Sequence, residues 1–581
     1  MKKKYTDEEN IQILIALLKE HNIKKIIVSP GTTHLSFVSS VQSDDYFELY
    51  SCVDERSATY MACGLSEETG EPVVITCTGA TASRNYLPGL TEAYYNKIPI
   101  VAVTATQHLG KVGQNIPQVL DRSSQMKDIV KKSIQLNIVK SEEDRWSNNL
   151  KINDVLLECR RNGGGPVHIN METTYSNNFI TGSIPKQRVI NRYTIDDILP
   201  KIENVNSVAI FVGNHTCFND NLTKLIEEFC EKYNAIVICD QSSNYNGKYK
   251  ILGNLIFANA KKDYKTFDLL IDIGNISGAY MEINPNEIWR VNPDGELRDT
   301  YKKLSKVFSM TEEMFFLEYN RLKEQIDGNS LYLKYESEDK RLREKLEKME
   351  LPFSNPFIVK NTIKRIEEDS VVHLAILNTL RSWNYYKTDK KIKFYSNTGG
   401  FGIDGIMSTA IGTSLGTSKK VYCFIGDLAF FYDLNSLGNI NVKNNLRIMM
   451  INNGCGAEFH LYNHRATKMA KENGISQKFA AADGHFGNKS DKLVKHMAED
   501  LGFKYMSAND KKEFLNNVDE FVNGESDKPI IFEIFTTSED ESKAQEMIAS
   551  LEVNTESIAK NTIKKVFGEK GIKAVKKILG R

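Results

Sequence analysis

The chain has 581 residues, of which 41% are hydrophobic and 26% charged, so it is long enough for roughly two to four domains with full cores. Its 75 Lys and Arg residues balance its 75 Asp and Glu residues, so the charge points to no nucleic-acid partner and to no anionic surface. The cysteines have no zinc-finger or CxxC spacing, and no apolar run reaches the ~20 residues of a membrane span. We therefore expect a cytoplasmic protein with reduced thiols.

The chain starts with a short basic run that acidic residues interrupt at Asp7, which is not the pattern of a secretion signal. Thr6 and Glu9 have the spacing of a capping box. We therefore expect an amphipathic first helix to begin at this point.

Short apolar runs alternate with helix-length segments along the chain, which is typical of parallel sheets that helices cover on both faces. Polar segments around 185–197 and 335–357 separate these runs into three groups. The sequence therefore predicts an α/β protein with three doubly wound parallel-sheet domains of one architecture. The predicted strands are KKIIVSP, EPVVITCTG, IPIVAVTA and GPVHINM, then SVAIFVG, AIVICDQ, FDLLIDIG and EIWRVN, then SVVHLAI, KKVYCFIGD, NLRIMMINN and KPIIFEIF.

We place the three domains at residues 1–185, 190–345 and 355–540, with a basic tail at 541–581. The end of this tail, ESIAKNTIKKVFGEKGIKAVKKILGR, has apolar residues at helical spacing. It is interpreted either as a helix docked on the body or as a basic amphipathic helix that contacts a membrane surface or a partner.

The third domain carries the pattern with the clearest chemistry. One predicted strand ends at Gly426 and Asp427, with a helix expected to begin after Leu428, and the next strand ends at Asn453, followed by Gly454. The carboxyl ends of neighbouring parallel strands meet at one sheet edge, where ligands bind. The helix N-terminus and the two glycines suit a phosphate group that approaches the backbone closely.

The same stretch offers oxygen ligands for a hard cation. The Asp427 carboxylate, the Asn453 side chain and the Cys455 carbonyl would supply three, and a diphosphate with water would complete the octahedron that Mg²⁺ prefers. A pair of ordinary turns is the alternative interpretation. A Gly-Asp pair followed at the next strand end by Asn-Asn is the more specific pattern.

This pattern resembles the cofactor motif of thiamin-diphosphate (ThDP) enzymes, and the resemblance extends from about Lys24 to Phe535. It implies a pyrimidine domain, a central domain and a diphosphate domain in chain order. It also implies ThDP and Mg²⁺ as cofactors, with the metal on Asp427, Asn453 and Cys455. The positions that match cofactor-binding residues are Glu55, Thr78, Gly79, Ile403, Gly426, Asp427, Leu428, Ala429, Asn453, Cys455, Gly456 and Ala457.

The resemblance gives a role to Glu55 in the stretch DERSATYMACGL. It matches the acid that shares a proton with the cofactor's aminopyrimidine ring and is the expected catalytic residue. The small and apolar residues around it would remove water from its carboxyl group and raise its pKa. The alternative is a surface acid in the first turn of a helix. Since Glu55 and Asp427 belong to different domains, the resemblance also implies a homodimer or homotetramer with active sites at a subunit interface.

Within the family the chain resembles the menaquinone-pathway synthases that make 2-succinyl-5-enolpyruvyl-6-hydroxy-3-cyclohexene-1-carboxylate. The shared stretches are SPG, DERSA, GIDGIMSTAIG and GDLAFFYDLNSL. Three arginines of those synthases are replaced, in the stretches SPGTTH and ATQH and at Thr398. Without a guanidinium, carboxylate recognition is lost at these positions.

We therefore expect a relative with a changed substrate pocket. It would act as a lyase or transferase that decarboxylates a 2-oxo acid and protonates the acyl fragment or adds it to a carbonyl acceptor, such as a sugar derivative. The alternatives are the menaquinone-pathway synthase itself, a ThDP-binding protein without catalysis, and an oxidase or hydrolase of the same fold. The candidate substrate residues are His34, Arg84, Gln107, His108, Gln114, Asn115, Glu458 and His460.

Overall fold

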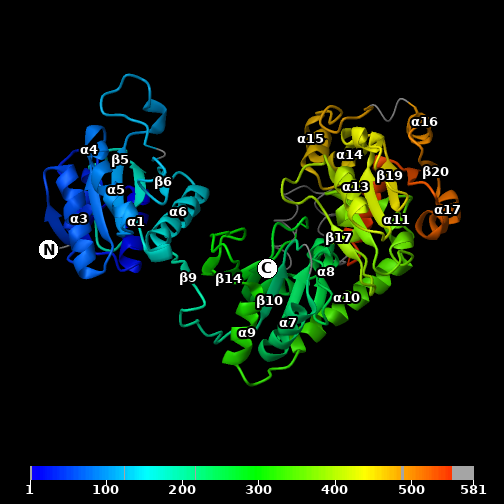
Figure 1. The fold of residues 1–581 in the computed structure, drawn as a ribbon, viewed down its shortest axis with the longest axis horizontal. Helices are drawn as coiled ribbons and strands as arrows, with labels where there is room; N and C mark the ends of the chain where they lie inside the picture. The colour runs from blue at the N-terminus through cyan, green and yellow to red at the C-terminus, as the bar shows by residue number, and fades with distance from the viewer. Residues whose placement is uncertain (1–2, 123–124, 216–217, 280, 486–489, 553–581) are drawn as a thin grey trace, which may run out of the picture. The chain divides into compact units, whose positions relative to one another are not determined.

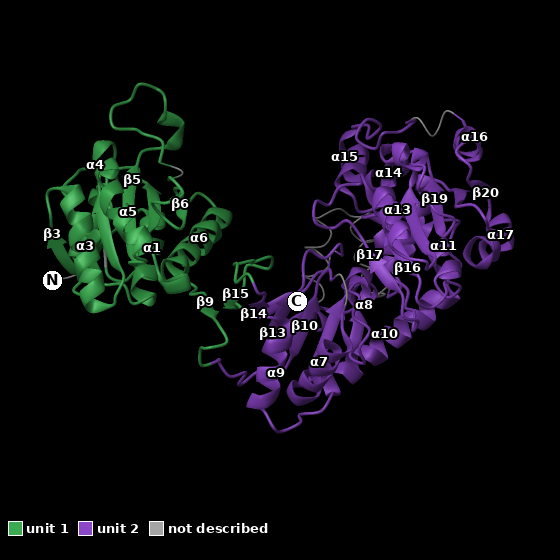
Figure 2. Ribbon diagram, in the orientation of Figure 1, with its two compact units in different colours: residues 1–198, 294–309 green, residues 199–293, 310–581 purple. Residues whose placement is uncertain are grey.

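The computed structural model describes residues 3–122, 125–215, 218–279, 281–485 and 490–552. Within these ranges the chain is an α/β protein with large parallel sheets, as the sequence predicted (Figure 1). It divides into two compact units (Figure 2). Unit 1 comprises residues 1–198 and 294–309, and unit 2 comprises residues 199–293 and 310–581.

The main sheet of unit 1 has six parallel strands in the order β3-β2-β4-β5-β7-β6. Helices cover both of its faces. Ile26 and Val74 belong to a core shared with α1, α2 and α6, whereas Ile27 and Ile75 belong to a core shared with α3 and α5. The strands are β2 (Lys25–Val28), β3 (Glu48–Ser51), β4 (Val73–Cys77), β5 (Ile100–Thr106), β6 (Ser133–Leu136) and β7 (Val167–Glu172). The helices are α1 (Glu9–Glu20), α2 (Leu35–Gln42), α3 (Glu55–Thr69), α4 (Thr81–Asn85), α5 (Leu87–Tyr95) and α6 (Glu142–Arg160).

The start of the chain differs from the prediction. Residues Lys4–Thr6 form strand β1, which pairs antiparallel with β8 (Phe179–Thr181). Helix α1 begins at Glu9 with Glu8 as its N-cap and no side-chain cap, so the predicted capping box is wrong. Thr6 belongs to the strand, and its hydroxyl oxygen accepts a hydrogen bond from the Glu8 backbone N–H.

The second sheet lies in unit 2, where five parallel strands follow the order β12-β11-β10-β13-β14. They are β10 (Val208–Val212), β11 (Ala235–Cys239), β12 (Lys250–Leu252), β13 (Thr266–Ile273) and β14 (Asn284–Val291). The helices of this region are α7 (Asp220–Tyr233), α8 (Gly253–Asn259), α9 (Glu312–Leu322) and α10 (Ser330–Lys348). Unit 1 holds one further parallel pair, β9 (Asn191–Tyr193) with β15 (Leu304–Phe308).

The third sheet, also in unit 2, has six parallel strands in the order β17-β16-β18-β19-β21-β20. They are β16 (Val371–Leu374), β17 (Lys393–Tyr395), β18 (Val421–Gly426), β19 (Leu446–Asn452), β20 (Lys504–Ala508) and β21 (Ile530–Phe535). One face packs on α13, α14 and α16, and Trp383 of α12 and Phe521 of α17 pack on the other. The helices are α11 (Asn355–Thr362), α12 (Asn378–Trp383), α13 (Ile406–Gly416), α14 (Asp427–Tyr432), α15 (Arg465–Asn473), α16 (Leu493–Asp500), α17 (Lys511–Asn523) and α18 (Ser538–Ala549).

The first and third sheets have one topology. Numbered by their order in the chain, the strands of both run 2-1-3-4-6-5 across the sheet. The second sheet runs 3-2-1-4-5, so the central region shares the predicted parallel α/β architecture but has a different strand order.

Helix α18 continues across the boundary predicted at residue 540, and Glu541 is fully buried in unit 2. The rest of the predicted basic tail, residues 553–581, lies outside the described residues. Among the described helices, none has both the length and the apolar character needed to cross a bilayer.

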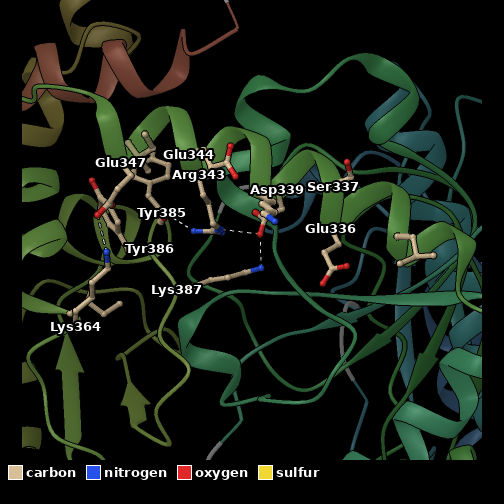
Figure 3. A pocket seen from close by; sticks show the side chains of 14 residues that line it. Glu336, Ser337, Asp339, Arg343, Glu344, Glu347, Lys364, Tyr385, Tyr386 and Lys387 are labelled. Carbon is tan, nitrogen blue, oxygen red and sulfur yellow. Dashed lines mark hydrogen bonds and ion pairs between the residues drawn. The ribbon is translucent and has the colours of Figure 1, made fainter.

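Helix α10 carries a buried cluster of charges. Asp339 is 2% exposed and accepts a hydrogen bond from Arg343 Nε at 2.9 Å and another from Lys387 (Figure 3). Burial by itself raises the pKa of the Asp339 carboxyl, but the two cations outweigh it and hold that pKa below its usual range. The cluster lines a cavity of about 830 Å³ and joins the central part of unit 2 to the segment that follows α12.

Replacing Asp339 with Asn should lower the free energy of unfolding by about 2–4 kcal/mol, because Arg343 and Lys387 would then lie close together without a counter-charge. Chemical denaturation would measure the change. Glu336→Gln, an exposed acid on the same helix and cavity wall, is the matched control and should change it by less than about 0.5 kcal/mol. Equal effects of the two substitutions would contradict this role of Asp339.

Candidate functional site

The candidate diphosphate site lies where β18 and β19 end. These parallel strands are neighbours, with Gly426 opposite Ile451, so Asp427 and Asn453 follow them at the same edge of the sheet. Helix α14 begins at Asp427, whereas the sequence predicted a start after Leu428. The reason is local, because Asp427 Oδ1 accepts a hydrogen bond from the Leu428 backbone N–H at 2.8 Å, which brings Asp427 into the first turn.

The Asp427 carboxylate is only 1% exposed, and it joins the two strand ends. Its Oδ2 atom accepts hydrogen bonds from the Gly454 backbone N–H at 2.6 Å and from His485 Nε2 at 3.1 Å. Gly454 has φ of 72°, a left-handed conformation that favours glycine. The turn after β19 therefore places backbone donors beside a buried acid.

The other predicted metal ligands lie in the same turn. Asn453 Oδ1 accepts a weak hydrogen bond from the Cys455 backbone N–H at 3.4 Å. Burial raises the pKa of the Cys455 thiol to about 12, so without a metal the thiol stays neutral at pH 7. A buried carboxylate, an amide oxygen and a backbone carbonyl are the donor types that Mg²⁺ takes, so this set fits a magnesium-bound diphosphate.

The remaining predicted cofactor residues of unit 2 lie around the same strand ends. Ile403 is partly buried and packs against the core under the third sheet. The others lie in the β18–α14 junction and in the turn after β19, namely Gly426, Leu428, Ala429, Gly456 and Ala457.

A covering segment, defined here as residues 477–485, contacts the turn after β19. The Gly456 backbone N–H donates to the Ala481 carbonyl at 2.6 Å. His460 lies between Asp483, with Nε2 at 2.7 Å from Oδ1, and Gln477, whose Nε2 is 2.5 Å from His460 Nδ1. Together with the His485 contact to Asp427, these bonds fix the segment to the candidate diphosphate site.

Unit 1 carries the predicted catalytic acid at an equivalent sheet edge. Glu55 is the first residue of α3, after the N-cap Asp54, whose side chain accepts from the Arg56 backbone N–H at 3.0 Å. The Glu55 carboxylate is half-exposed and accepts a hydrogen bond from Asn85 Nδ2 at 3.2 Å. The burial expected from its small and apolar neighbours is therefore not complete in the single chain.

The strand order reverses between β2 and β4, and Thr78 and Gly79 directly follow β4 at this point. A Cβ atom at Gly31 would lie 2.4 Å from the Thr78 Cβ, so only glycine allows this approach of the two loops. Arg122 is fully buried beside Gly79, and its Nη2 donates to the Ala105 carbonyl at 2.6 Å. Sequence reasoning missed Arg122, because nothing near it in the chain marks it as buried.

His34, a predicted substrate residue, is 1% exposed, with its Nδ1 at 3.0 Å from Thr76 Oγ1. Burial lowers its pKa to about 4, so the ring is neutral at pH 7. Burial together with this partner is typical of a structural histidine.

The other predicted substrate residues of unit 1 are more exposed. Arg84 donates to the Asp121 carbonyl at 3.2 Å, Gln107 accepts from Lys111 at 2.7 Å, and His108 accepts from the Gly110 backbone N–H. Gln114 and Asn115 are exposed in the loop that follows, where Asn115 has φ of 54°.

Glu458 lies in unit 2 and has a partner that the sequence did not reveal. Its carboxylate forms a two-bond ion pair with Arg381 of α12, at 2.8 and 2.9 Å. The pair lines a cavity of about 480 Å³ between α8, α12, α18 and the loop after His460. Arg381 and Glu458 are far apart in sequence, so only the fold brings them together.

Helix α18 holds α12 in place through a buried acid. Glu541 accepts hydrogen bonds from Asn378 Nδ2 at 3.0 Å, from the Asn355 backbone N–H at 3.0 Å and from Thr536 Oγ1 at 3.0 Å. Its complete burial nevertheless raises the pKa of its carboxyl to about 7.

Comparisons with known proteins agree with this geometry. Residues 10–126 match the thiamine pyrophosphate enzyme N-terminal TPP binding domain, and residues 378–534 match the C-terminal TPP binding domain. The 2-succinyl-5-enolpyruvyl-6-hydroxy-3-cyclohexene-1-carboxylate synthase of Bacteroides thetaiotaomicron is 31% identical over 92% of this chain and 96% of its own length. Proteins of the same name from Bacteroides fragilis and Flavobacterium johnsoniae are 29% and 25% identical, over 92% and 90% of this chain and 97% and 95% of their own lengths.

The Glu541 carboxyl should make stability depend on pH. The folded-state pKa of Glu541 is near 7, whereas an unfolded Glu titrates near 4.5. The contribution of Glu541 to the free energy of unfolding is therefore complete below about pH 4.5 and is lost as the pH rises to about 7. We expect the unfolding free energy of the wild type, relative to Glu541→Gln, to fall by about 3 kcal/mol between pH 4.5 and 8. Urea denaturation across this range would measure it, and a constant difference would contradict the raised pKa.

Proposed function

Because this chain belongs to the thiamin-diphosphate-dependent enzymes, we propose that it decarboxylates a 2-oxo acid and then protonates the acyl fragment or transfers it to a carbonyl acceptor. The observation that carries this proposal is the meeting of Asp427 and Asn453 at the ends of two neighbouring strands, within the region that matches a TPP-binding domain. We also propose that it works in the cytoplasm.

In this proposal Asp427, the Asn453 side chain and the Cys455 carbonyl hold Mg²⁺, which in turn binds the diphosphate. Gly426 and Gly454 leave the backbone accessible to the phosphate oxygens. When bound, the cofactor would supply the electron-accepting carbon that decarboxylation of a 2-oxo acid requires. Ile403 supports it from the apolar side of the site.

Glu55 holds a proton next to the pyrimidine ring, and the hydrogen bond from Asn85 keeps its carboxylate oriented at the start of α3. Thr78 and Gly79, which follow β4, would contact the cofactor from unit 1. We propose a homodimer or homotetramer in which each site combines residues of two subunits, because one closed two-fold interface would then complete two sites at once.

The cavity beside Glu458 supports a hydroxylated acceptor. The ion pair with Arg381 neutralises the carboxylate, so the cavity wall offers acceptors and donors without a net charge from this pair. Such a wall favours hydroxyl and carbonyl groups, as in a sugar derivative, over a polyanion. Gln107, His108, Gln114, Asn115 and Arg84 would act from unit 1, whereas both ring nitrogens of His460 already have partners.

The menaquinone-pathway reaction is the second candidate, and the names of the similar proteins from Bacteroides favour it. Thr33-His34, Gln107 and Thr398 stand where those synthases carry arginines. Arginines elsewhere in the chain would have to bind the anionic substrates instead, and Arg84, which is exposed, is the candidate.

Carbon dioxide release separates the candidates. Purified protein with ThDP and Mg²⁺ would be offered pyruvate, 2-oxoglutarate, phosphonopyruvate and hydroxypyruvate. We expect one acid to be decarboxylated, with Glu55→Gln slower by about 10²–10⁴-fold, the usual contribution of acid–base catalysis. Asp54→Asn, which preserves the helix cap, is the matched control and should stay active. Release from 2-oxoglutarate alone favours the menaquinone-pathway reaction, and no release from any acid contradicts the proposal.

The choice of acceptor should depend on Glu458. In Glu458→Gln the negative charge beside the Arg381 guanidinium is removed, so a carboxylate acceptor should bind better and a neutral one worse. With a donor acid identified, the ratio of kcat/KM for glyoxylate to that for glyceraldehyde should rise about 10-fold, which corresponds to roughly 1.4 kcal/mol. Glu539→Gln, an exposed acid of α18, is the control. An unchanged ratio would exclude the ion pair from acceptor recognition.

A further inference from the structure

Three metal-binding side chains converge where the covering segment contacts the turn after β19. Cys455 is buried, His460 and Asp483 are half-buried, and one ligand atom of each lies within 4.8 Å of the other two. The cluster combines a sulfur, a ring nitrogen and a carboxylate oxygen. This is the donor set of a zinc-type ion rather than of Mg²⁺.

The hydrogen bonds of His460 add an independent observation. Its Nδ1 lies 2.5 Å from Gln477 Nε2, while Gln477 Oε1 is buried and has no hydrogen-bond partner among the described residues. The oxygen and nitrogen of an amide are assigned from the surrounding network. Turning the Gln477 amide lets its oxygen accept a hydrogen bond from a His460 Nδ1–H group, while the amide nitrogen takes the buried position.

In this orientation of the amide, the proton of His460 lies on Nδ1. With the proton on Nδ1, the lone pair of Nε2 faces Asp483 Oδ1 at 2.7 Å. Two acceptors at that distance repel each other unless a proton or a metal cation lies between them. The Cys455 thiol is the third member of the cluster. A proton shared by His460 and Asp483 would leave this thiol without a ligand, whereas a metal ion would bind all three side chains.

We propose that Cys455 Sγ, His460 Nε2 and Asp483 Oδ1 bind a borderline divalent cation such as Zn²⁺, with water as the fourth ligand. Ligands at about 2.0–2.3 Å from zinc stand roughly 3.3–3.8 Å apart in a tetrahedron, so the side chains need to move by about 1 Å. Gln477 orients the ring through its other nitrogen, as second partners of metal-bound histidines do.

This site is separate from the magnesium site and does not rest on the proposed reaction. Cys455 would give its carbonyl oxygen to Mg²⁺ and its sulfur to the second ion. The second ion would fasten the covering segment to the turn after β19, adding to the Gly456–Ala481 hydrogen bond.

Cobalt is the probe, because Co²⁺ takes the place of Zn²⁺ and gives a near-ultraviolet charge-transfer band only when a thiolate binds it. The full chain, saturated with ThDP and Mg²⁺, would be titrated with Co²⁺ and then with Zn²⁺. We expect the band to saturate at one equivalent and to disappear when Zn²⁺ displaces Co²⁺. Cobalt that enters the magnesium site gives no such band, since Cys455 would offer only its carbonyl oxygen there.

Variants assign the ligands. Cys455→Ser should abolish the band, and His460→Asn should weaken cobalt binding at least 100-fold. Gln477→Leu, which leaves all three ligands in place, should weaken it about 10–100-fold. His496→Gln, a histidine on the exposed side of α16, is the control and should bind as the wild type does. Circular dichroism verifies the fold of each variant.

The absence of a thiolate band in the folded wild type would overturn the proposal, and a proton would then join His460 to Asp483. If Gln477→Leu leaves the cobalt affinity unchanged, the Gln477 amide does not orient the His460 ring for metal binding.

Discussion

The hydrogen bond from the Gly454 backbone N–H to Asp427 Oδ2 joins the carboxyl ends of β18 and β19, and the candidate site is built around it. A buried carboxylate needs donors, and here the turn of the neighbouring strand and His485 supply them. The parallel arrangement makes this possible, because neighbouring strands end at the same edge. One acid thereby sets the position of the turn that carries Asn453 and Cys455.

From this turn the chain continues to Glu458, whose ion pair with Arg381 ties the site to α12. Helix α12 is in turn held by Glu541 of α18 through Asn378. A change in α18 would therefore reach the cavity wall through two consecutive polar contacts. Polar groups with fixed partners connect the end of the described chain to the proposed acceptor site, and apolar packing alone would give no such defined orientation.

The sequence was sufficient for the fold class and for the buried strands. Every predicted apolar run is a strand, whereas the edge strands β3, β6, β17 and β20 were missed, because their short and partly polar sequences lack a continuous apolar signal. Motif residues next to strand ends, such as Asp427, were identifiable for the same local reason. The sequence could not identify Arg381, Asp483 and Gln477, because their roles arise only from contacts with residues distant in sequence.

The charge cluster on α10 has a consequence for the temperature dependence of this region. Hydration of ions becomes less favourable on heating, so burying Asp339 with Arg343 and Lys387 costs less as the temperature rises, while the stabilisation per unit of buried apolar area levels off. On cooling, burying these charges costs more, and the stabilisation from buried apolar area weakens. The contact between the central part of unit 2 and the segment after α12 should therefore weaken on cooling and lose less stability on heating than apolar packing alone would.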